Sequence, residues 1–270
     1  MKPVDHSGWD NRTFHLGNQM LIRIPSAECY AAKVEIEQQW LPKLAPHLPL
    51  PIPTPLAMGN PGEGYPWKWS IYRWLKGNSA AFSSIENLNN FATCLGQFLN
   101  TLQKIDTKGG PLPGIHNFYH GGMLKFYDVE TRQAIDLLKE KLELSLIIEI
   151  WELALASNWQ NESVWVHGDV SAGNLLVQDG KLSAVIDFGS MAIGDPACDL
   201  SIAWTLFDQE SRQIFRSMLS LDSDTWARGR GWTLWKALII AAKMVETNAI
   251  EGTQSWRIIQ DIITDHNINL

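Results

Sequence analysis

The sequence predicts an α+β protein with a small β-rich N-terminal lobe and a larger helical C-terminal lobe. Two observations carry this prediction. Before residue 77 the apolar runs are short and broken by turn-forming residues, as in strands, whereas after Gly77 apolar residues recur at helical spacings of three and four. The chain has 270 residues, 45% of them hydrophobic and 19% charged, so it can bury a core. We expect the lobes to comprise residues 1–76 and 77–270.

The first lobe is predicted to contain a hairpin, a helix and a buried strand. Phe14–Leu16 and Met20–Ile24 flank the turn formers Gly17 and Asn18, which is typical of a hairpin. Ala31–Leu44 has the apolar spacing of an amphipathic helix, with Pro42 expected to end or kink it. The Pro-rich segment LAPHLPLPIPTPLAMG then suits an extended connector, and WKWSIYRWL suits a buried strand.

The second lobe is predicted to be helical apart from one β-like segment. A helical pattern runs from Leu88 to Leu102, and another begins at about Asp128, as its N-cap, and continues to Leu142. A further block reaches Leu155, and helical spacing returns after Leu200. Between these blocks, residues 164–188 contain the short apolar runs VWV, NLLV and AVIDF separated by turn formers, as expected of strands.

Composition makes several classes of protein improbable. The formal charge of 22 − 29 = −7 disfavours binding to nucleic acid or an anionic membrane, and no apolar stretch is long enough to span a bilayer. The three cysteines form neither a disulfide pattern nor a zinc pattern, and the opening residues have no apolar signal-peptide core. We therefore expect a cytoplasmic protein, monomeric or homodimeric, without nucleic-acid or membrane partners.

Four polar residues stand on short loops of the β-like segment: His167, Asp169, Asn174 and Asp187. Taken singly, Asp169 could cap a turn, and Asp187 could cap a loop or bind a metal. Asn174 supplies an amide oxygen of the kind that Mg²⁺ accepts. Together they meet a requirement of phosphoryl transfer, in which one carboxylate orients or deprotonates a hydroxyl group while an Asn and a second Asp hold Mg²⁺ on the nucleotide phosphates.

The segment HGDVSAGN followed by VIDFG resembles the catalytic and metal-binding loops of the aminoglycoside phosphotransferase family, relatives of the protein kinases. The resemblance covers nearly the whole chain. It implies a bilobal protein-kinase-like fold and a Mg²⁺-dependent enzyme that moves the γ-phosphoryl group of ATP or GTP to a small-molecule hydroxyl. It also implies that Asp169 is the catalytic base, that Asn174 and Asp187 are metal ligands, and that Asp199 braces the catalytic loop or caps a helix. His167 is interpreted as a support for that loop.

The expected nucleotide site departs from the kinase pattern in two places. The first turn, SGWDN, lacks a GxGxxG motif, so only Gly8 and the amides of residues 10–12 could approach phosphate. Where kinases carry a Lys, the strand LIRIP has Arg23, whose guanidinium can grip phosphate oxygens and pair with a carboxylate. Its expected partner on the helix is Glu37, with Glu35 as the alternative.

By the same resemblance, IYRWLKG is the hinge between the lobes. A purine would hydrogen-bond to backbone groups around Arg73 and Leu75 and pack against Tyr72. Backbone contacts leave no side-chain signature, so ATP and GTP both stay open. Trp69 and Trp74 line the purine slot or, as we prefer, pack in the core.

The resemblance places the acceptor against the helical lobe. Carboxylates after the metal loop and the charge of −7 favour a cationic acceptor. An aminoglycoside antibiotic is the family's best-known acceptor, and a macrolide, a choline-like amine or a sugar are alternatives. A metabolite kinase and a catalytically silent nucleotide-binding relative therefore stay open as functions, and a protein kinase is disfavoured because no APE segment is present. The candidate carboxylates are Asp208, Glu210, Asp222, Asp224, Glu246 and Glu251.

Overall fold

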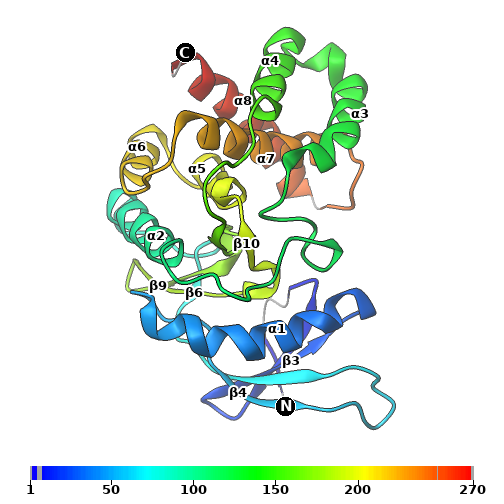
Figure 1. The fold of residues 1–270 in the computed structure, drawn as a ribbon, viewed down its shortest axis with the longest axis vertical. Coiled ribbons are helices and arrows are strands. Elements are labelled where there is room, and N and C mark those ends of the chain that lie inside the picture. The colour runs from blue at the N-terminus through cyan, green and yellow to red at the C-terminus, as the bar shows by residue number, and fades with distance from the viewer. Residues whose placement is uncertain (1, 5–7, 248, 269–270) are drawn as a thin grey trace.

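The N-terminal lobe is a five-stranded antiparallel sheet packed against one long helix, as the computed structural model shows for residues 2–4, 8–247 and 249–268 of the chain (Figure 1). The helix, α1 (Glu28–Leu44), buries one face that includes Val34, Trp40 and Leu41. The strand order is β1-β2-β3-β5-β4. Its members are β1 (Lys2–Pro3), β2 (Asn11–Leu16), β3 (Met20–Pro25), β4 (Pro55–Gly59) and β5 (Trp69–Arg73).

The predicted hairpin and helix are confirmed, and the Pro-rich connector needs a correction. β2 and β3 pair with Leu16 opposite Met20, and α1 ends two residues after Pro42. The connector is extended only in part. Residues 45–47 form a short 3₁₀ helix, which tolerates a proline at its start, and residues 55–59 form strand β4. β4 is an edge strand, where Pro55 leaves no central hydrogen bond of the sheet unmade.

The C-terminal lobe is mainly helical around two small sheets (Figure 1). Its largest fully buried side chains include Trp151, Trp165 and Trp204. Trp165 also contacts Trp40 of α1, with ring centroids 4.9 Å apart, so the two lobes share aromatic packing. The helices are α2 (Leu88–Leu102), α3 (Asp128–Leu138), α4 (Leu144–Leu155), α5 (Ile202–Thr205), α6 (Gln209–Ser217), α7 (Ser223–Ala241) and α8 (Ala249–Ile268).

The β-like segment folds as strands, but not as a single unit. β8 (Leu175–Gln178) and β9 (Lys181–Val185) form a hairpin with β6 (Asn78–Ser79) at its edge, whereas β7 (Val164–Val166) pairs with β10 (Ala192–Gly194). The sequence did not predict β10. β5 belongs to the five-stranded sheet of the N-terminal lobe, whereas β6, the next strand along the chain, belongs to the three-stranded sheet of the C-terminal lobe. We therefore propose that the boundary between the lobes lies at Lys76–Gly77, between these two strands.

Two helix boundaries differ from the prediction. Asp128 is the first residue of α3 and not its N-cap, and its carboxylate accepts hydrogen bonds from Arg132 and Trp151. α3 ends at Leu138 instead of Leu142 and is followed by a 3₁₀ turn, Lys139–Lys141. In the described part of the chain, no helix is both long enough and apolar enough to cross a bilayer.

Candidate active site

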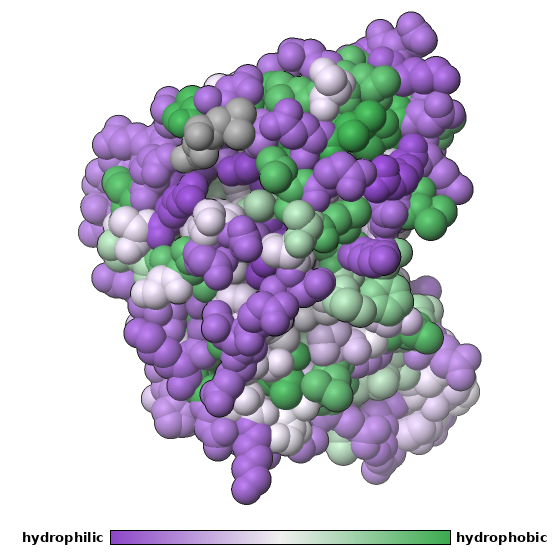
Figure 2. All heavy atoms as spheres, turned by 45° about the horizontal axis from the view of Figure 1, so that its top comes forward, coloured by the Kyte–Doolittle hydropathy of each residue, from purple (hydrophilic) through white to green (hydrophobic). Residues whose placement is uncertain are grey.

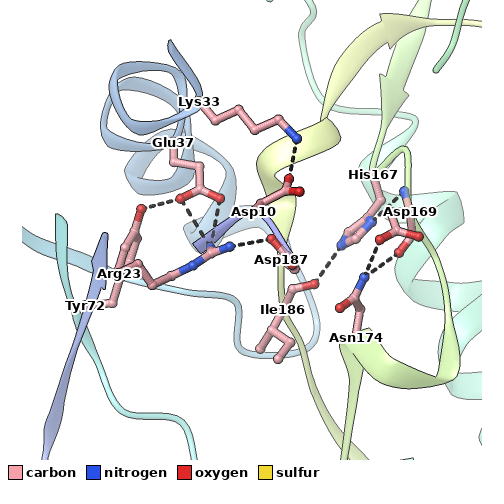
Figure 3. Close-up of polar contacts among 10 residues, drawn as sticks. All are labelled: Asp10, Arg23, Lys33, Glu37, Tyr72, His167, Asp169, Asn174, Ile186 and Asp187. Atoms are coloured by element: carbon pink, nitrogen blue, oxygen red, sulfur yellow. Dashed lines mark hydrogen bonds and ion pairs between the residues drawn. The ribbon is translucent and has the colours of Figure 1, made fainter. Parts of the chain in front are cut away.

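The structure brings Asp169, Asn174 and Asp187 together at the ends of β7, β8 and β9 (Figure 3). The Asn174 side-chain amide donates hydrogen bonds to the Asp169 backbone oxygen at 2.9 Å and to its carboxylate at 2.8 Å. The Ile186 amide donates to the Asn174 backbone oxygen, so the residue after Ile186 is held beside the catalytic loop. Asp187 adopts a left-handed conformation with φ of 65°, which ends β9 sharply.

Asp199 braces the catalytic loop, as expected. This fully buried carboxylate accepts hydrogen bonds from the His167 amide at 2.8 Å and the Gly168 amide at 2.7 Å. The alternative role, a helix cap, belongs to Asp195, which accepts from the Ala197 amide. Two backbone donors of the loop are thus satisfied by one side chain.

His167 joins the catalytic loop to the metal loop. Its Nδ1 accepts from the Asp169 amide and its Nε2 donates to the Ile186 carbonyl, so the neutral imidazole has its proton on Nε2. Burial lowers the pKa of His167, which agrees with a neutral ring. The residue positions Asp169 and Asp187 and is not itself placed to exchange a proton.

The backbone at position 168, the middle residue of the HGD motif, requires a glycine. Its φ is +83°, and a Cβ atom at this position would lie 2.3 Å from the Ser190 backbone oxygen. A side chain here would push the catalytic loop away from the metal loop, because that contact is far inside van der Waals distance.

Arg23 bridges the lobes through two carboxylates. Its Nη1 donates to Glu37 at 3.1 Å and its Nη2 donates to Asp187 at 2.6 Å (Figure 3). The alternative partner, Glu35, is paired with Lys68 on the surface, so the choice of Glu37 is confirmed. Arginine suits this position because its planar guanidinium can bind two carboxylates at once.

Tyr72 lies elsewhere than expected. Its ring is 1% exposed, and its hydroxyl group donates a hydrogen bond to Glu37. The side chain therefore supports the Arg23–Glu37 pair from within the core and does not face an open purine slot. The reason is strand register: Tyr72 lies opposite Leu21 of β3, on the sheet face that α1 covers.

The two acidic residues of the site have opposite pKa shifts. Desolvation, and then the charge of Asp187, raise the pKa of Asp169 to about 6, although its side chain still reaches solvent. Burial alone would raise the pKa of Asp187 too, but the Arg23 guanidinium outweighs it and the net shift is downward. Burial raises the pKa of Glu37. Asp187 is thus held as an anion, while Asp169 is poised to take up a proton near neutral pH.

The donor set fits a hard divalent cation. Both hydrogen bonds of the Asn174 side chain use its Nδ2, and Asp187 uses only Oδ1 for Arg23, so one oxygen of each side chain can face a metal ion. Carboxylate and amide oxygens are the ligands that Mg²⁺ prefers. Within the described ranges no three His, Cys, Asp or Glu side chains form a metal cluster, so a metal here would need further oxygens from phosphate or water.

The hinge amides are partly occupied. The Arg73 amide donates to Thr54 and the Trp74 amide donates to Gln19. Of the two expected backbone positions, the Arg73 amide is therefore already used within the lobe, and the Arg73 side chain is exposed. Trp69 packs against Gly59, where a Cβ atom would come within 2.0 Å of its ring, so it belongs to the packing of the sheet.

The predicted acceptor carboxylates do not gather at the site. Asp208 and Asp222 cap α6 and α7 by accepting from the Ser211 and Thr225 amides. Glu210 accepts from Asn89 on α2. The other two with described side chains, Asp224 and Glu246, are exposed, and the side chain of Glu251 lies outside the described residues.

One ion pair near the site was not predicted. Lys33 of α1 has a side chain only 5% exposed, and its ammonium donates to Asp10 of the first turn at 2.5 Å (Figure 3). Nearby, a Cβ atom on Gly8 would lie 4.0 Å from Oδ2 of Asp187, so the turn closes over the metal loop. The sequence did carry a signal: Lys33 precedes Glu37 by four residues, on the buried face of the helix.

A two-lobed fold with this arrangement of Asp, Asn and Asp defines the class of kinase-like phosphotransferases. A family model described as "Phosphotransferase enzyme family" matches residues 2–232, and the chain belongs to that family.

Known relatives agree with this assignment. YcbJ of Bacillus subtilis, described as uncharacterized, is 21% identical over 189 residues, which cover 67% of this chain and 58% of YcbJ. The aminoglycoside 3'-phosphotransferase of Escherichia coli is 34% identical over 67 residues, 24% of this chain and 25% of that enzyme. The aligned chain thus spans little more than half of the first relative and a quarter of the second.

Solved structures confirm the predicted kinase-like fold. The complex of APH(2")-IIIa with GDP and kanamycin superposes with a TM-score of 0.73 at 18% identity, over 98% of this chain and 93% of that one. The macrolide 2'-phosphotransferase MphH of Brachybacterium faecium gives a TM-score of 0.62 at 18% identity, over 96% and 90% of the two chains.

Proposed function

We propose that the protein transfers the γ-phosphoryl group of ATP or GTP to a hydroxyl group of a small molecule, with Mg²⁺ as its metal. The observation that carries this proposal is the contact between Asn174 and Asp169 beside an Arg23-bound Asp187. The solved relatives bound to GDP, ADP or ATP support a nucleotide donor.

Each residue has a role in this reaction. The acceptor oxygen forms a bond to the γ-phosphorus while the bond from that phosphorus to the β,γ-bridging oxygen breaks, and its electron pair leaves with the nucleoside diphosphate. Asp169 orients the hydroxyl group and receives its proton. Asn174 and Asp187 would hold Mg²⁺, which neutralises phosphate charge when bound. Arg23 would bind phosphate oxygens, kept in place by Glu37.

The decisive experiment is a coupled nucleotide-consumption assay with ATP and GTP across aminoglycosides, macrolides, choline and simple sugars. We expect acceptor-dependent release of nucleoside diphosphate that disappears in Asp169→Asn, while nucleotide affinity stays near wild type. An aminoglycoside as the best acceptor would indicate antibiotic phosphorylation, and choline or a sugar would indicate a metabolite kinase.

A catalytically silent nucleotide-binding relative is the second candidate, favoured by Arg23 and by the first turn without GxGxxG. It predicts nucleotide binding without turnover for any acceptor. Calorimetry with Mg·ATP tests the metal site that both candidates share: Asp187→Ala should abolish Mg²⁺-dependent binding, and undiminished affinity would reject its role as a metal ligand.

A further inference from the structure

Lys33 is a buried cation where the two lobes meet. Its side chain is only 5% exposed, which is unusual for a lysine. The ammonium lies 5.1 Å from the ring centroid of Tyr30, on α1, and 5.2 Å from that of Phe118, in the C-terminal lobe. A Cβ atom on Gly189 would lie 3.2 Å from Cδ of Lys33. The side chain therefore extends along the metal loop, which contains Asp187 and Gly189.

Lys33 is paired with Asp10, in the turn before β2. The Asp10 carboxylate accepts a hydrogen bond from the Lys33 ammonium at 2.5 Å and is 25% exposed (Figure 3). Asp10 also lies close to the catalytic carboxylate: desolvation and the charge of Asp187 raise the pKa of Asp169, and the charge of Asp10 raises it further. Lys33 and Asp10 thus form an ion pair beside both acidic residues of the site.

We expect the phosphates of a nucleotide to lie next to this ion pair. A metal ion on Asp187 would hold phosphate oxygens at the metal loop, and a Cβ atom on Gly8, in the same turn as Asp10, would lie 4.0 Å from Oδ2 of Asp187. The segment that carries Phe118 lies above the start of α1 on the right of Figure 1, and Figure 2 shows the surface indented on that side. A ligand can therefore approach Lys33 from solvent.

The Asp10 carboxylate and a bound phosphate would compete for Lys33. Both are anions that accept charge-assisted hydrogen bonds from an ammonium, and side by side they would repel each other. The backbone of the turn can stay in place during an exchange, because Ser26 fixes it. The Ser26 amide donates to the Asp10 backbone oxygen at 2.9 Å, and its hydroxyl donates to that of Trp9 at 2.6 Å. Rotation of the Asp10 side chain toward solvent is then enough to release Lys33.

Arg23 alone is poorly supplied for binding phosphate. Its Nη1 pairs with Glu37 and its Nη2 with Asp187, so two carboxylates already share its charge. A nucleoside triphosphate carries more negative charge than one bound Mg²⁺ neutralises, so a second cation is expected at the site. Lys33 lies one helical turn before Glu37, on the same buried face of α1.

From this geometry we propose that Lys33 is a second phosphate-binding cation, which Asp10 occupies in the free protein and the phosphates of Mg·nucleotide take over on binding. This inference rests on the proposed function and adds a donor-binding residue to it. On binding, the ammonium exchanges one anionic partner for another, and the freed carboxylate turns to water. Asp10 therefore lowers the affinity for nucleotide, because its ion pair must be broken first.

The two halves of the ion pair give opposite predictions. Calorimetry measures the binding of Mg·ATP and Mg·GTP to wild type and variants, with adenosine and guanosine as probes that lack phosphate. Lys33→Met should weaken triphosphate binding about tenfold, because a charge-assisted hydrogen bond is lost, and should leave nucleoside binding unchanged. Asp10→Asn should tighten triphosphate binding about fivefold, because Lys33 no longer has an anionic partner to give up. A pair that only stabilises the turn would weaken binding in both variants or in neither.

A double variant and a matched pair complete the experiment. When Lys33 is already Met, adding Asp10→Asn should tighten triphosphate binding less than it does in wild type, because the two residues are coupled. Lys68→Met and Glu35→Gln each break an exposed lysine–carboxylate pair of the N-terminal lobe, 2.6 Å long, and should change no affinity.

Unchanged triphosphate binding in Lys33→Met, or weaker or unchanged binding in Asp10→Asn, overturns the proposal. Asp10→Asn decides it alone if Lys33→Met fails to fold, since Asp10 is partly exposed and Ser26 holds its backbone. Because no acceptor is needed, absent turnover would count against the proposed function and not against the role of Lys33. Wild type that binds neither triphosphate would overturn both.

Discussion

At the scale of single residues, Asp169 should set the pH dependence of turnover. Partial desolvation and the charge of Asp187 raise the pKa of its carboxyl to about 6. Only the ionised form can accept the proton of the acceptor hydroxyl. We therefore expect kcat/KM to level off above pH 6 and to fall about tenfold for each pH unit below it. Steady-state kinetics at pH values above and below 6 measure this fall in kcat/KM. A profile that is flat with pH would reject Asp169 as the base.

The same shift predicts a change in stability. A carboxyl whose pKa is higher in the folded state than in the unfolded state destabilises the fold above the higher value, and this cost fades as pH falls toward the lower one. Asp169→Asn should therefore raise the free energy of unfolding above pH 6, and the gain should shrink between about 6 and the ordinary value of 3.8. Urea titrations at several pH values measure it.

Arg23 and Glu37 form the second residue-scale prediction. Arg23→Met leaves Glu37, 5% exposed, as a buried carboxylate without its cation, and should lower the free energy of unfolding by about 3–5 kcal/mol. Adding Glu37→Gln should recover much of this loss, because the amide is neutral and can still accept from Tyr72. Urea denaturation measures both. Lys68→Met, which breaks the exposed pair with Glu35, is the control and should cost less than about 1 kcal/mol.

Residue types and spacing were enough to predict which loop residues meet, but not the direction of every side chain. Asp169, Asn174 and Asp187 converge because short strands on both sides of each loop leave few alternatives. Tyr72 shows the limit, since the face on which a strand residue lies depends on register with β3, which the sequence does not display. Lys33 was overlooked because a lysine on a helix is normally solvated, and its partner Asp10 is 23 positions away.

At the scale of elements, the catalytic loop depends on a carboxylate from a separate 3₁₀ helix. Asp199 satisfies two loop amides, and Asn at this position offers one acceptor oxygen and an NH₂ group that faces the second amide. We expect Asp199→Asn to lower the free energy of unfolding by about 1–3 kcal/mol and to reduce kcat. Asp224→Asn, in the exposed first turn of α7, is the matched control and should change neither.

Helices were easier to predict than strands, for a physical reason. α2 agrees with its predicted bounds because a long amphipathic helix repeats its signal several times and Asn87 caps it. β10 has three residues and exists through pairing with β7, so its stabilisation comes from a distant segment. β4 was not predicted because Pro55 and the prolines before it suggested an extended connector, although a proline is compatible with the start of an edge strand.

For the whole molecule, we expect the contacts between the two lobes to couple nucleotide binding to overall stability. The Arg23–Asp187 pair joins the lobes, and the proposed ligands of Mg²⁺ and phosphate come from both. Mg·nucleotide should therefore stabilise the protein as one cooperative unit. At a concentration about 100 times Kd, the expected gain is about 2.7 kcal/mol, which corresponds to a rise in Tm of about 5 °C for a chain of this size.

Calorimetric scans with ATP and GTP, with and without EDTA, measure this gain and show which purine is preferred. Chelation should remove most of the rise in Tm, and Asp187→Ala should remove it even with Mg²⁺ present, since the variant lacks the proposed metal ligand. Two separate transitions, only one of them shifted by nucleotide, would show instead that the lobes unfold independently. A rise in Tm that survives both EDTA and Asp187→Ala would mean that nucleotide binds without the metal site inferred from Asn174 and Asp187.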